Sequence, residues 1–246
     1  MLKELKRSAL PKEELYLKKE IWAILEKTGL EDLSQALSPY PPSKRISYLI
    51  GAFLHPQEEV RWKAIFAFGL SVSQLAEGDL EKARIVIRRL MWMLNEESGG
   101  MAWGVGEAFA EALYNSETLN KEYLQIYVSY IWPEGNYLEF PPAQRGVIWG
   151  VGRLAQKYRE DLLKISAHNY LIYHFTSLDP MVVFLSLWSF SFFREVITVE
   201  RELISQAFQF IEEKNTAPLF FDGKEIKTWT VSHLKKLYNF VYSRVG

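Results

Sequence analysis

The sequence predicts an all-α protein in which paired helices stack into an α-solenoid, followed by a short C-terminal β-hairpin and a final helix. Three observations lead to this fold class. Apolar residues recur at spacings of three and four from the N-terminus to about Asn215, as in amphipathic helices. One helical motif returns at a constant offset along the chain. After Lys214 the helical pattern gives way to short β-prone runs around Asp222-Gly223.

The helical part divides into a cap and about four repeats, within a single domain that spans residues 1–246. Residues 1–42 are expected to form the helices that cap one end, and residues 43–198 the repeats. The first helices of the repeats are predicted at 43–54, 80–95, 120–132 and 159–173. Helix 80–95 shows the pattern well, because Ala83, Ile87 and Leu90 share one stripe. Linkers that contain proline or glycine separate these helices from their partners.

The second helices carry the motif that repeats. His55-Pro56 is followed by Val60-Arg61-Trp62 in a helix predicted at 58–75, which resembles the second helix of a HEAT repeat. The step from Arg61 to Trp103 equals the step from Trp103 to Arg145, and we call this step the repeat offset. It lies within the range of roughly 40 to 47 residues that is typical of HEAT and armadillo repeats. A fourth second helix is expected to begin at Asp179-Pro180.

Most of the chain resembles a little-characterised bacterial family of HEAT-repeat-like, armadillo-type proteins. The matching stretches are 88–92, 94–100, 103–104, 107–108, 129–131, 135–139, 144–146 and 149–150, together with the closing hairpin. The resemblance implies the fold. It brings no known activity and no catalytic residues, so function has to be argued from the site itself.

The C-terminal part of the chain, 199–246, is expected to add a helix at 199–214, the hairpin, and a helix at 231–245. Asp222-Gly223 between two short β-prone runs predicts a tight type I′ turn. A lone hairpin is marginally stable in water. We therefore expect it to lie against the last repeat and cover the open edge of that repeat.

Composition limits the classes of function. The 246 residues include 29 basic and 30 acidic side chains, so no overall field draws the protein to nucleic acid or to anionic lipid. The absence of cysteine excludes disulfides, thiolate catalysis and cysteine-bound metals. The N-terminal segment is charged and the longest apolar run, 181–193, is shorter than the roughly 20 residues of a membrane span. These features predict a cytoplasmic protein without membrane contact.

The repeat offset groups the candidate site residues into columns on neighbouring helices. Trp103, Glu107, Arg145 and Trp149 form a predicted binding patch of two indoles, a carboxylate and a guanidinium. The competing interpretation places both tryptophans in the core. The next column contains Gly69, Glu111, Arg153 and Glu195, and predicts an ion-pair ladder in which both glutamates flank Arg153.

The loop at 95–100 could extend the patch. Asn95, Glu97 and Ser98 lie there, and Gln144 lies beside Arg145. Paired glycines before a helix can expose amides to an anion, but the nearby glutamates would repel a phosphate. We therefore favour a cationic or amide-bearing partner. The alternative is a tight turn that lets two helices approach.

The residue patterns favour binding over catalysis. His55, His168, His174 and His233 lack metal-ligand spacing, and no nucleophile elbow or phosphate-binding loop occurs. We predict no catalytic residue, no metal and no cofactor, and a scaffold that holds a peptide or protein. The alternative is a HEAT-like DNA glycosylase for alkylated bases, with Glu107 as catalytic carboxylate, although the charge balance disfavours nucleic acid. A third possibility is a lyase or chaperone for a prosthetic group, similar to HEAT-like bilin lyases.

Overall fold

The structure, a computed structural model, describes residues 12–96 and 103–242. Most of these residues are helical, and one small antiparallel sheet lies near the C-terminus, as predicted. The helices are α1 (Lys12–Lys27), α2 (Leu30–Leu37), α3 (Pro42–Ala52), α4 (Glu58–Gly78), α5 (Leu80–Leu94), α6 (Val105–Asn115), α7 (Glu117–Ser129), α8 (Pro141–Lys164), α9 (Ala167–Tyr173), the 3-10 turn η1 (His174–Thr176), α10 (Pro180–Phe190), α11 (Arg201–Glu213) and α12 (Val231–Tyr242), with strands β1 (Leu219–Phe221) and β2 (Ile226–Thr228). The parts of the predicted terminal helices before residue 12 and after residue 242 lie outside the described residues.

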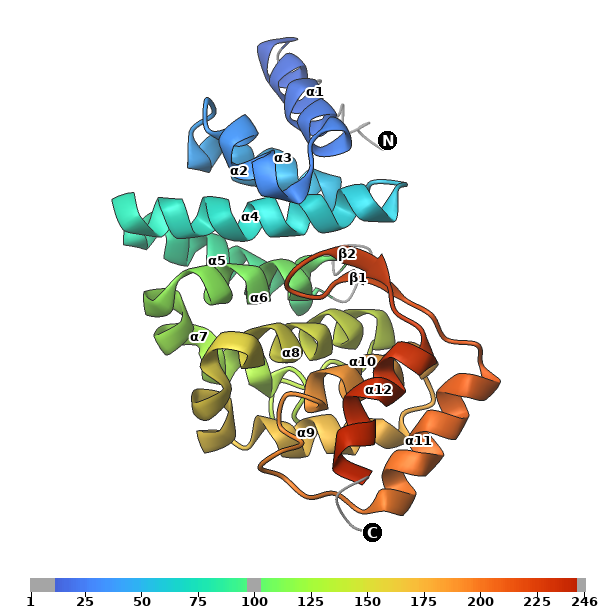
Figure 1. Cartoon of the computed structure of the whole chain (residues 1–246). Coiled ribbons are helices and arrows are strands. Elements are labelled where there is room, and N and C mark those ends of the chain that lie inside the picture. The colour runs from blue at the N-terminus through green and yellow to red at the C-terminus, as the bar shows by residue number, and fades with distance from the viewer. Residues whose placement is uncertain (1–11, 97–102, 243–246) are drawn as a thin grey trace, which may run out of the picture.

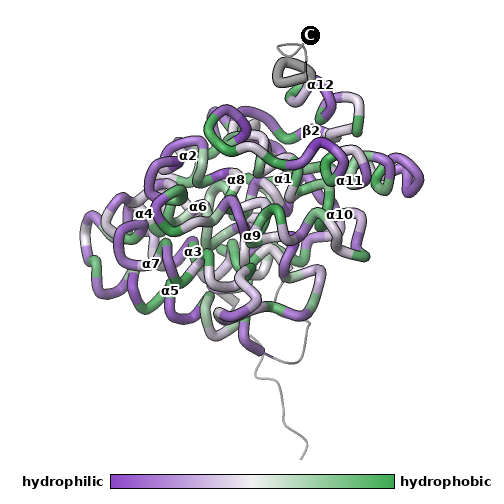
Figure 2. The backbone as a smooth tube through the Cα atoms, turned by 90° about the horizontal axis from the view of Figure 1, so that it is seen from below, coloured by the Kyte–Doolittle hydropathy of each residue, from purple (hydrophilic) through white to green (hydrophobic). Residues whose placement is uncertain are grey.

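Four helices pack one against the next through the centre of the molecule. Helix α4 packs on α6, α6 on α8, and α8 on α10 (Figure 1). The intervening helices lie to one side of this series, where α5 contacts α4 and α6, and α7 contacts α6 and α8. Hydrophilic segments predominate along the outer turns of α4, α5 and α7 (Figure 2). The side chains of α10 from Val182 to Phe190 are all buried, so the longest apolar run of the sequence forms a core helix.

Glycines allow the central helices to approach closely. A Cβ at Gly69 of α4 would lie 2.5 Å from the Cβ of Glu111 on α6. A Cβ at Gly106 of α6 would lie 2.8 Å from the backbone nitrogen of Val147 on α8. Real Cβ contacts are longer than this, so a larger residue at either position would push the helices apart.

The repeat offset describes the register of the first three central helices. Ser73 Oγ donates to Asn115 O at 2.8 Å, and Arg153 Nε donates to Glu111 Oε1 at 2.6 Å, and each bond joins positions one repeat offset apart. The expected extension of the ladder to Glu195 is wrong. Helix α10 ends at Phe190, and Glu195 lies beyond it, exposed and 3.9 Å from Arg194.

One helix boundary also differs from the prediction. Residues from 159 onward were expected to begin a new helix, but α8 continues through a kink at Tyr158 to Lys164. Neither proline nor glycine occurs between Arg153 and Lys164, so the sequence contains no strong signal to end the helix there.

The hairpin forms where the sequence predicts it, with a different turn. Leu219 pairs with Thr228 and Phe221 with Ile226, and the amide of Asp222 donates to Glu225 O at 3.1 Å. The two-residue turn is therefore Gly223-Lys224. Gly223 has a φ of +102°, while Lys224 is not among the residues with positive φ. A type I′ turn needs positive φ at both positions, so the expected type is wrong and the pattern is that of type II′.

The expected place of the hairpin is only partly right. Phe220 of β1 packs on Trp188 of α10, in the last repeat, with ring centroids 5.0 Å apart, but the hairpin also crosses the middle of the series. Strand β1 packs on α4, and the sheet lies beside α4, α6 and α8 (Figure 1). Trp62 Nε1 donates to Leu219 O at 3.0 Å, and Trp149 Nε1 donates to Phe221 O at 2.8 Å. Tryptophans of α4 and α8 thus bond two carbonyls of the same strand and hold it across the helices.

None of the helices within residues 12–96 and 103–242 has both the length and the apolar character that crossing a membrane requires.

Candidate functional site

A cavity of about 140 Å³ lies where the hairpin crosses the central helices. Its walls are mostly apolar and aromatic, and four charged side chains enter them. The lining residues are Phe53, Glu58, Arg61, Trp62, Ile65, Trp103, Gly104, Glu107, Pro142, Arg145, Trp149, Met181, Leu185, Pro218, Leu219 and Phe220. A cavity of this size is comparable to one that holds a single benzene-sized group.

The four residues of the predicted patch all line this cavity. Trp103 lies just before α6 and Glu107 in its first turn, and Arg145 and Trp149 come from α8. They meet because equivalent positions of two neighbouring helices, one repeat apart, face the same side of the series. Most of the other lining residues come from α4, from α10, from the hairpin and its preceding proline, and from Phe53 after α3.

The other predicted site residues lie elsewhere. Asn95 ends α5, and its side-chain amide donates to Met91 O at 2.9 Å. Gln144 is buried and bonds Leu138 O, so it fixes the loop before α8. Neither residue lines the cavity. Glu97 and Ser98 lie outside the described residues.

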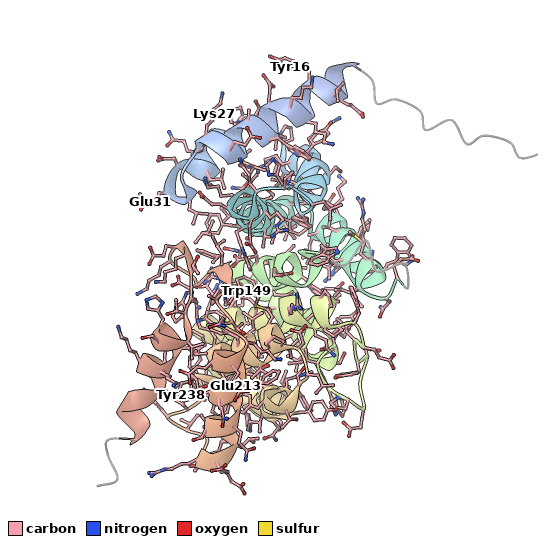
Figure 3. The ribbon with its side chains drawn as sticks, turned by 90° about the vertical axis from the view of Figure 1, so that its right-hand side faces the viewer. Tyr16, Lys27, Glu31, Trp149, Glu213 and Tyr238 are labelled. Carbon is pink, nitrogen blue, oxygen red and sulfur yellow. The ribbon has the colours of Figure 1, made fainter. Side chains whose placement is uncertain are left out.

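The three tryptophans differ in exposure. Trp149 is 1% exposed and lies near the centre of the molecule (Figure 3), and Trp62 is 8% exposed. Their ring centroids are 4.8 Å apart, and both indoles are bonded to the hairpin. Trp103, by contrast, is 44% exposed. Two walls of the cavity are therefore fixed parts of the core, while Trp103 presents an indole at the surface.

Among the charged groups that line the cavity, Glu107 has the fewest hydrogen-bond and ion-pair partners in the described part of the chain. Its carboxylate lies against Gly146 of α8, at the place that a Cβ would occupy. Burial raises the pKa of Glu107 to about 7, although its own backbone amide and the charge of Arg61 act in the opposite direction. No other residue in the described part of the chain donates a hydrogen bond to this carboxylate.

Glu111, one turn further along α6, provides a contrast. Its carboxylate accepts from Arg153 Nε at 2.6 Å and from Asn115 Nδ2 at 3.2 Å. Both Glu111 and Arg153 are buried, and the Arg153 guanidinium also stacks over the Tyr114 ring at 3.3 Å. This pair accounts for the first half of the predicted ladder and leaves Glu107 as the glutamate of α6 without a counterion at bonding distance among the described residues.

The two arginines of the cavity are already paired. Arg61 Nη2 lies 3.1 Å from Glu58 Oε1. Arg145 holds Asp179 with two bonds, from Nε at 3.2 Å and from Nη2 at 2.5 Å. Burial alone would raise the pKa of Asp179, but the bonds from Arg145 and from the Val182 amide lower it below its ordinary value. The charges of both guanidinium groups are thus balanced locally.

Several of these residues were not among the predicted site residues. Arg61 and Trp62 belong to the recurring motif, and their place in it was the available signal. Asp179 was assigned only to the start of a helix, where it caps α10 by accepting from Val182 N at 2.9 Å. The contribution of residues 218–220 depends on contacts between distant parts of the sequence, which no local pattern encodes.

Comparisons with known proteins assign no family to the chain. No family model matches it. An uncharacterised protein of Archaeoglobus fulgidus is 31% identical over 124 residues, which are 50% of this chain and 59% of that protein. The chain thus spans less than two thirds of the length of this relative. The relative is archaeal, so it lends no support to the bacterial origin that the resemblance implied.

Two crystal structures of engineered proteins from the Northeast Structural Genomics Consortium are similar in part. The first is 13% identical with a TM-score of 0.44, and covers 90% of this chain and 93% of that chain. The second is 14% identical with a TM-score of 0.44, and covers 84% of this chain and 85% of that chain. Function therefore has to be argued from the cavity.

Proposed function

We propose that the chain is a HEAT-like, armadillo-type α-solenoid that acts as a non-catalytic binding scaffold and holds a peptide or protein segment at the cavity. Support for the architecture comes from the serial packing of α4, α6, α8 and α10 and from bonds between residues one repeat offset apart. In such an architecture the second helices line one continuous face, which is suited to an extended partner.

The cavity itself carries the functional proposal. It is preformed, its walls are rigid aromatic side chains, and few polar groups enter it, which is typical of ligand sites. Because about 140 Å³ is too small for a folded partner, the cavity would receive one side chain of a segment that lies along the face. Exposed Trp103 would cover that side chain, as tryptophan does at many binding hot spots.

The glycosylase alternative rests on the same carboxylate between indoles, where a cationic damaged base would fit. It ranks second because Arg61 and Arg145 are bonded to Glu58 and Asp179. Arginines that are already paired gain less from phosphate, and phosphate contacts provide most non-specific affinity for DNA.

A selection from a displayed random peptide library tests the proposal. We expect enriched peptides to bind the full chain and to lose about tenfold or more in affinity for Trp103→Ala, as at a hot spot. Trp92→Ala is the matched control, because Trp92 on α5 is 56% exposed and does not line the cavity. Equal binding to both variants would contradict the proposal.

A parallel assay addresses the alternative. Duplex DNA with an N-methylated purine is incubated with the protein, and release of the free base is measured. Base release that disappears in Glu107→Gln would overturn the scaffold proposal in favour of the glycosylase.

A further inference from the structure

The cavity has an unusual balance of charge. Arg61 and Arg145 each have a carboxylate within bonding distance, whereas Glu107 has no counterion at that distance among the residues that the structure describes. Glu107 is partly exposed, through the cavity that it lines, and a carboxylate among mostly apolar walls is costly unless it is paired. The indoles of Trp62, Trp103 and Trp149 line the same space, and indole rings attract cations. An occupant with a positive charge would therefore satisfy both the carboxylate and the aromatic walls.

We infer that the cavity is a guanidinium site, which receives an arginine side chain of the bound segment and pairs it with Glu107. This inference rests on the proposed function and specifies its ligand. A guanidinium is planar, stacks on aromatic rings, and donates two parallel hydrogen bonds to a carboxylate. It is also more weakly hydrated than an ammonium, so entry into a mostly apolar cavity costs less. A volume of about 140 Å³ suits a group of this size.

The charged and polar groups around Glu107 are bonded to partners other than its carboxylate, which is consistent with a guanidinium site. Arg61 and Glu58 face the cavity from α4, and Arg145 faces it from α8, bonded to Asp179 at the start of α10. Behind Glu107, the Tyr127 hydroxyl of α7 donates to Gly106 O at 2.9 Å and gives no bond to the carboxylate. On the side of the hairpin, the lining residues are Pro218, Leu219 and Phe220, which are uncharged. A cation that enters thus meets one uncompensated negative group.

The test uses n-propylguanidine as a mimic of the arginine side chain and n-propylurea as its neutral counterpart. Binding to the full chain is followed by the indole signals in NMR spectra. We expect saturable shifts with n-propylguanidine and at least tenfold weaker binding of n-propylurea. Glu107→Gln should weaken the guanidine at least tenfold. The control Glu117→Gln removes an exposed carboxylate of α7, which pairs with Lys121, and should leave binding unchanged.

A second measurement needs no variant. Protons compete with the guanidine for Glu107, so the affinity of the wild-type chain should fall about tenfold from pH 8 to pH 6. Equal affinities for the urea and the guanidine would overturn the inference, as would binding that ignores both pH and Glu107→Gln. Tighter binding of n-butylamine than of n-propylguanidine would overturn the guanidinium assignment.

The two proposals can fail separately. Selected peptides that bind at Trp103 but lack arginine would overturn the guanidinium site and leave the scaffold standing. Guanidine binding that depends on Glu107, without any retained peptide, would support the site and count against the scaffold.

Discussion

Glu107→Gln should stabilise the protein at alkaline pH, although it removes a charge from the middle of the molecule. Burial raises the pKa of Glu107 from 4.5 to about 7. The native state therefore binds more protons than the unfolded state between these values, and stability falls as the pH rises through that window. Each unit of difference between the two pKa values corresponds to about 1.4 kcal/mol. The charged carboxylate therefore lowers the free energy of unfolding by up to about 3 kcal/mol at pH 8.

Water that enters the cavity screens the carboxylate, so we expect a smaller gain. Glutamine keeps the shape without the charge, and Glu107→Gln should raise the free energy of unfolding by about 1 to 2 kcal/mol at pH 8. At pH 5 the native carboxyl is already protonated, and the gain should drop below about 1 kcal/mol. Urea unfolding followed by circular dichroism at both pH values measures this. For a chain of this length, each kcal/mol also shifts the melting temperature by about 2 to 4 °C.

Glu111→Gln is the matched control on the same helix. It removes the partner of buried Arg153 and should lower the free energy of unfolding by about 3 kcal/mol or more. The two substitutions, one helical turn apart, should thus change the free energy of unfolding at pH 8 in opposite directions. If Glu107→Gln destabilises the protein at pH 8 to a similar extent as Glu111→Gln, then Glu107 has a partner in the folded chain and the reasoning is refuted.

Three further variants probe the packing of the helices, the hairpin and a buried histidine. Gly69→Ala places a Cβ 2.5 Å from Glu111 Cβ and should lower the free energy of unfolding, measured in urea, by about 1 to 3 kcal/mol. The control Gly78→Ala, at the open end of α4, should not lower it. Trp149→Phe leaves Phe221 O without its donor, so its melting temperature should fall by several degrees, and an unchanged melt would show that the hairpin does not depend on this bond. Burial lowers the pKa of His174 to about 4, so the native state binds fewer protons between this value and 6.5 and loses stability as the pH falls through that window. The wild type should lose about 2 kcal/mol more than His174→Gln between pH 7 and pH 5, and equal losses would contradict a buried neutral imidazole.

Local patterns predicted the helices best where a strong signal marks each end. The helix expected at 80–95 is α5, Leu80–Leu94, which begins after a side-chain cap from Asp79 and buries Ala83, Ile87 and Leu90. The expected break at 159 failed because α8 continues through a kink that no proline or glycine marks. The Asp-Gly pair located the hairpin, but the conformation of the turn depends on which two residues occupy its centre.

The grouping of the candidate site residues was predictable to the extent that it follows the repeat. The repeat offset was enough to group Trp103, Glu107, Arg145 and Trp149, which all line one cavity. The offset could not reveal that Trp149 is buried and Trp103 exposed, since exposure depends on what lies over the helices. The hairpin decides this, because its carbonyls accept from Trp62 and Trp149, and its position results from tertiary packing.

The same register that pairs Glu111 also explains why Glu107 is left alone. One repeat offset on from Glu111 lies Arg153, which supplies the counterion on α8. The same step from Glu107 leads to Trp149, and a step back leads to Ile65, so both neighbouring helices present apolar side chains to this carboxylate. Pairing within the stack is therefore impossible along this column, and Arg61 and Arg145 are held by other acids. A carboxylate that we expect to lower stability, and that the repeat cannot neutralise, fits the inferred cation from a partner.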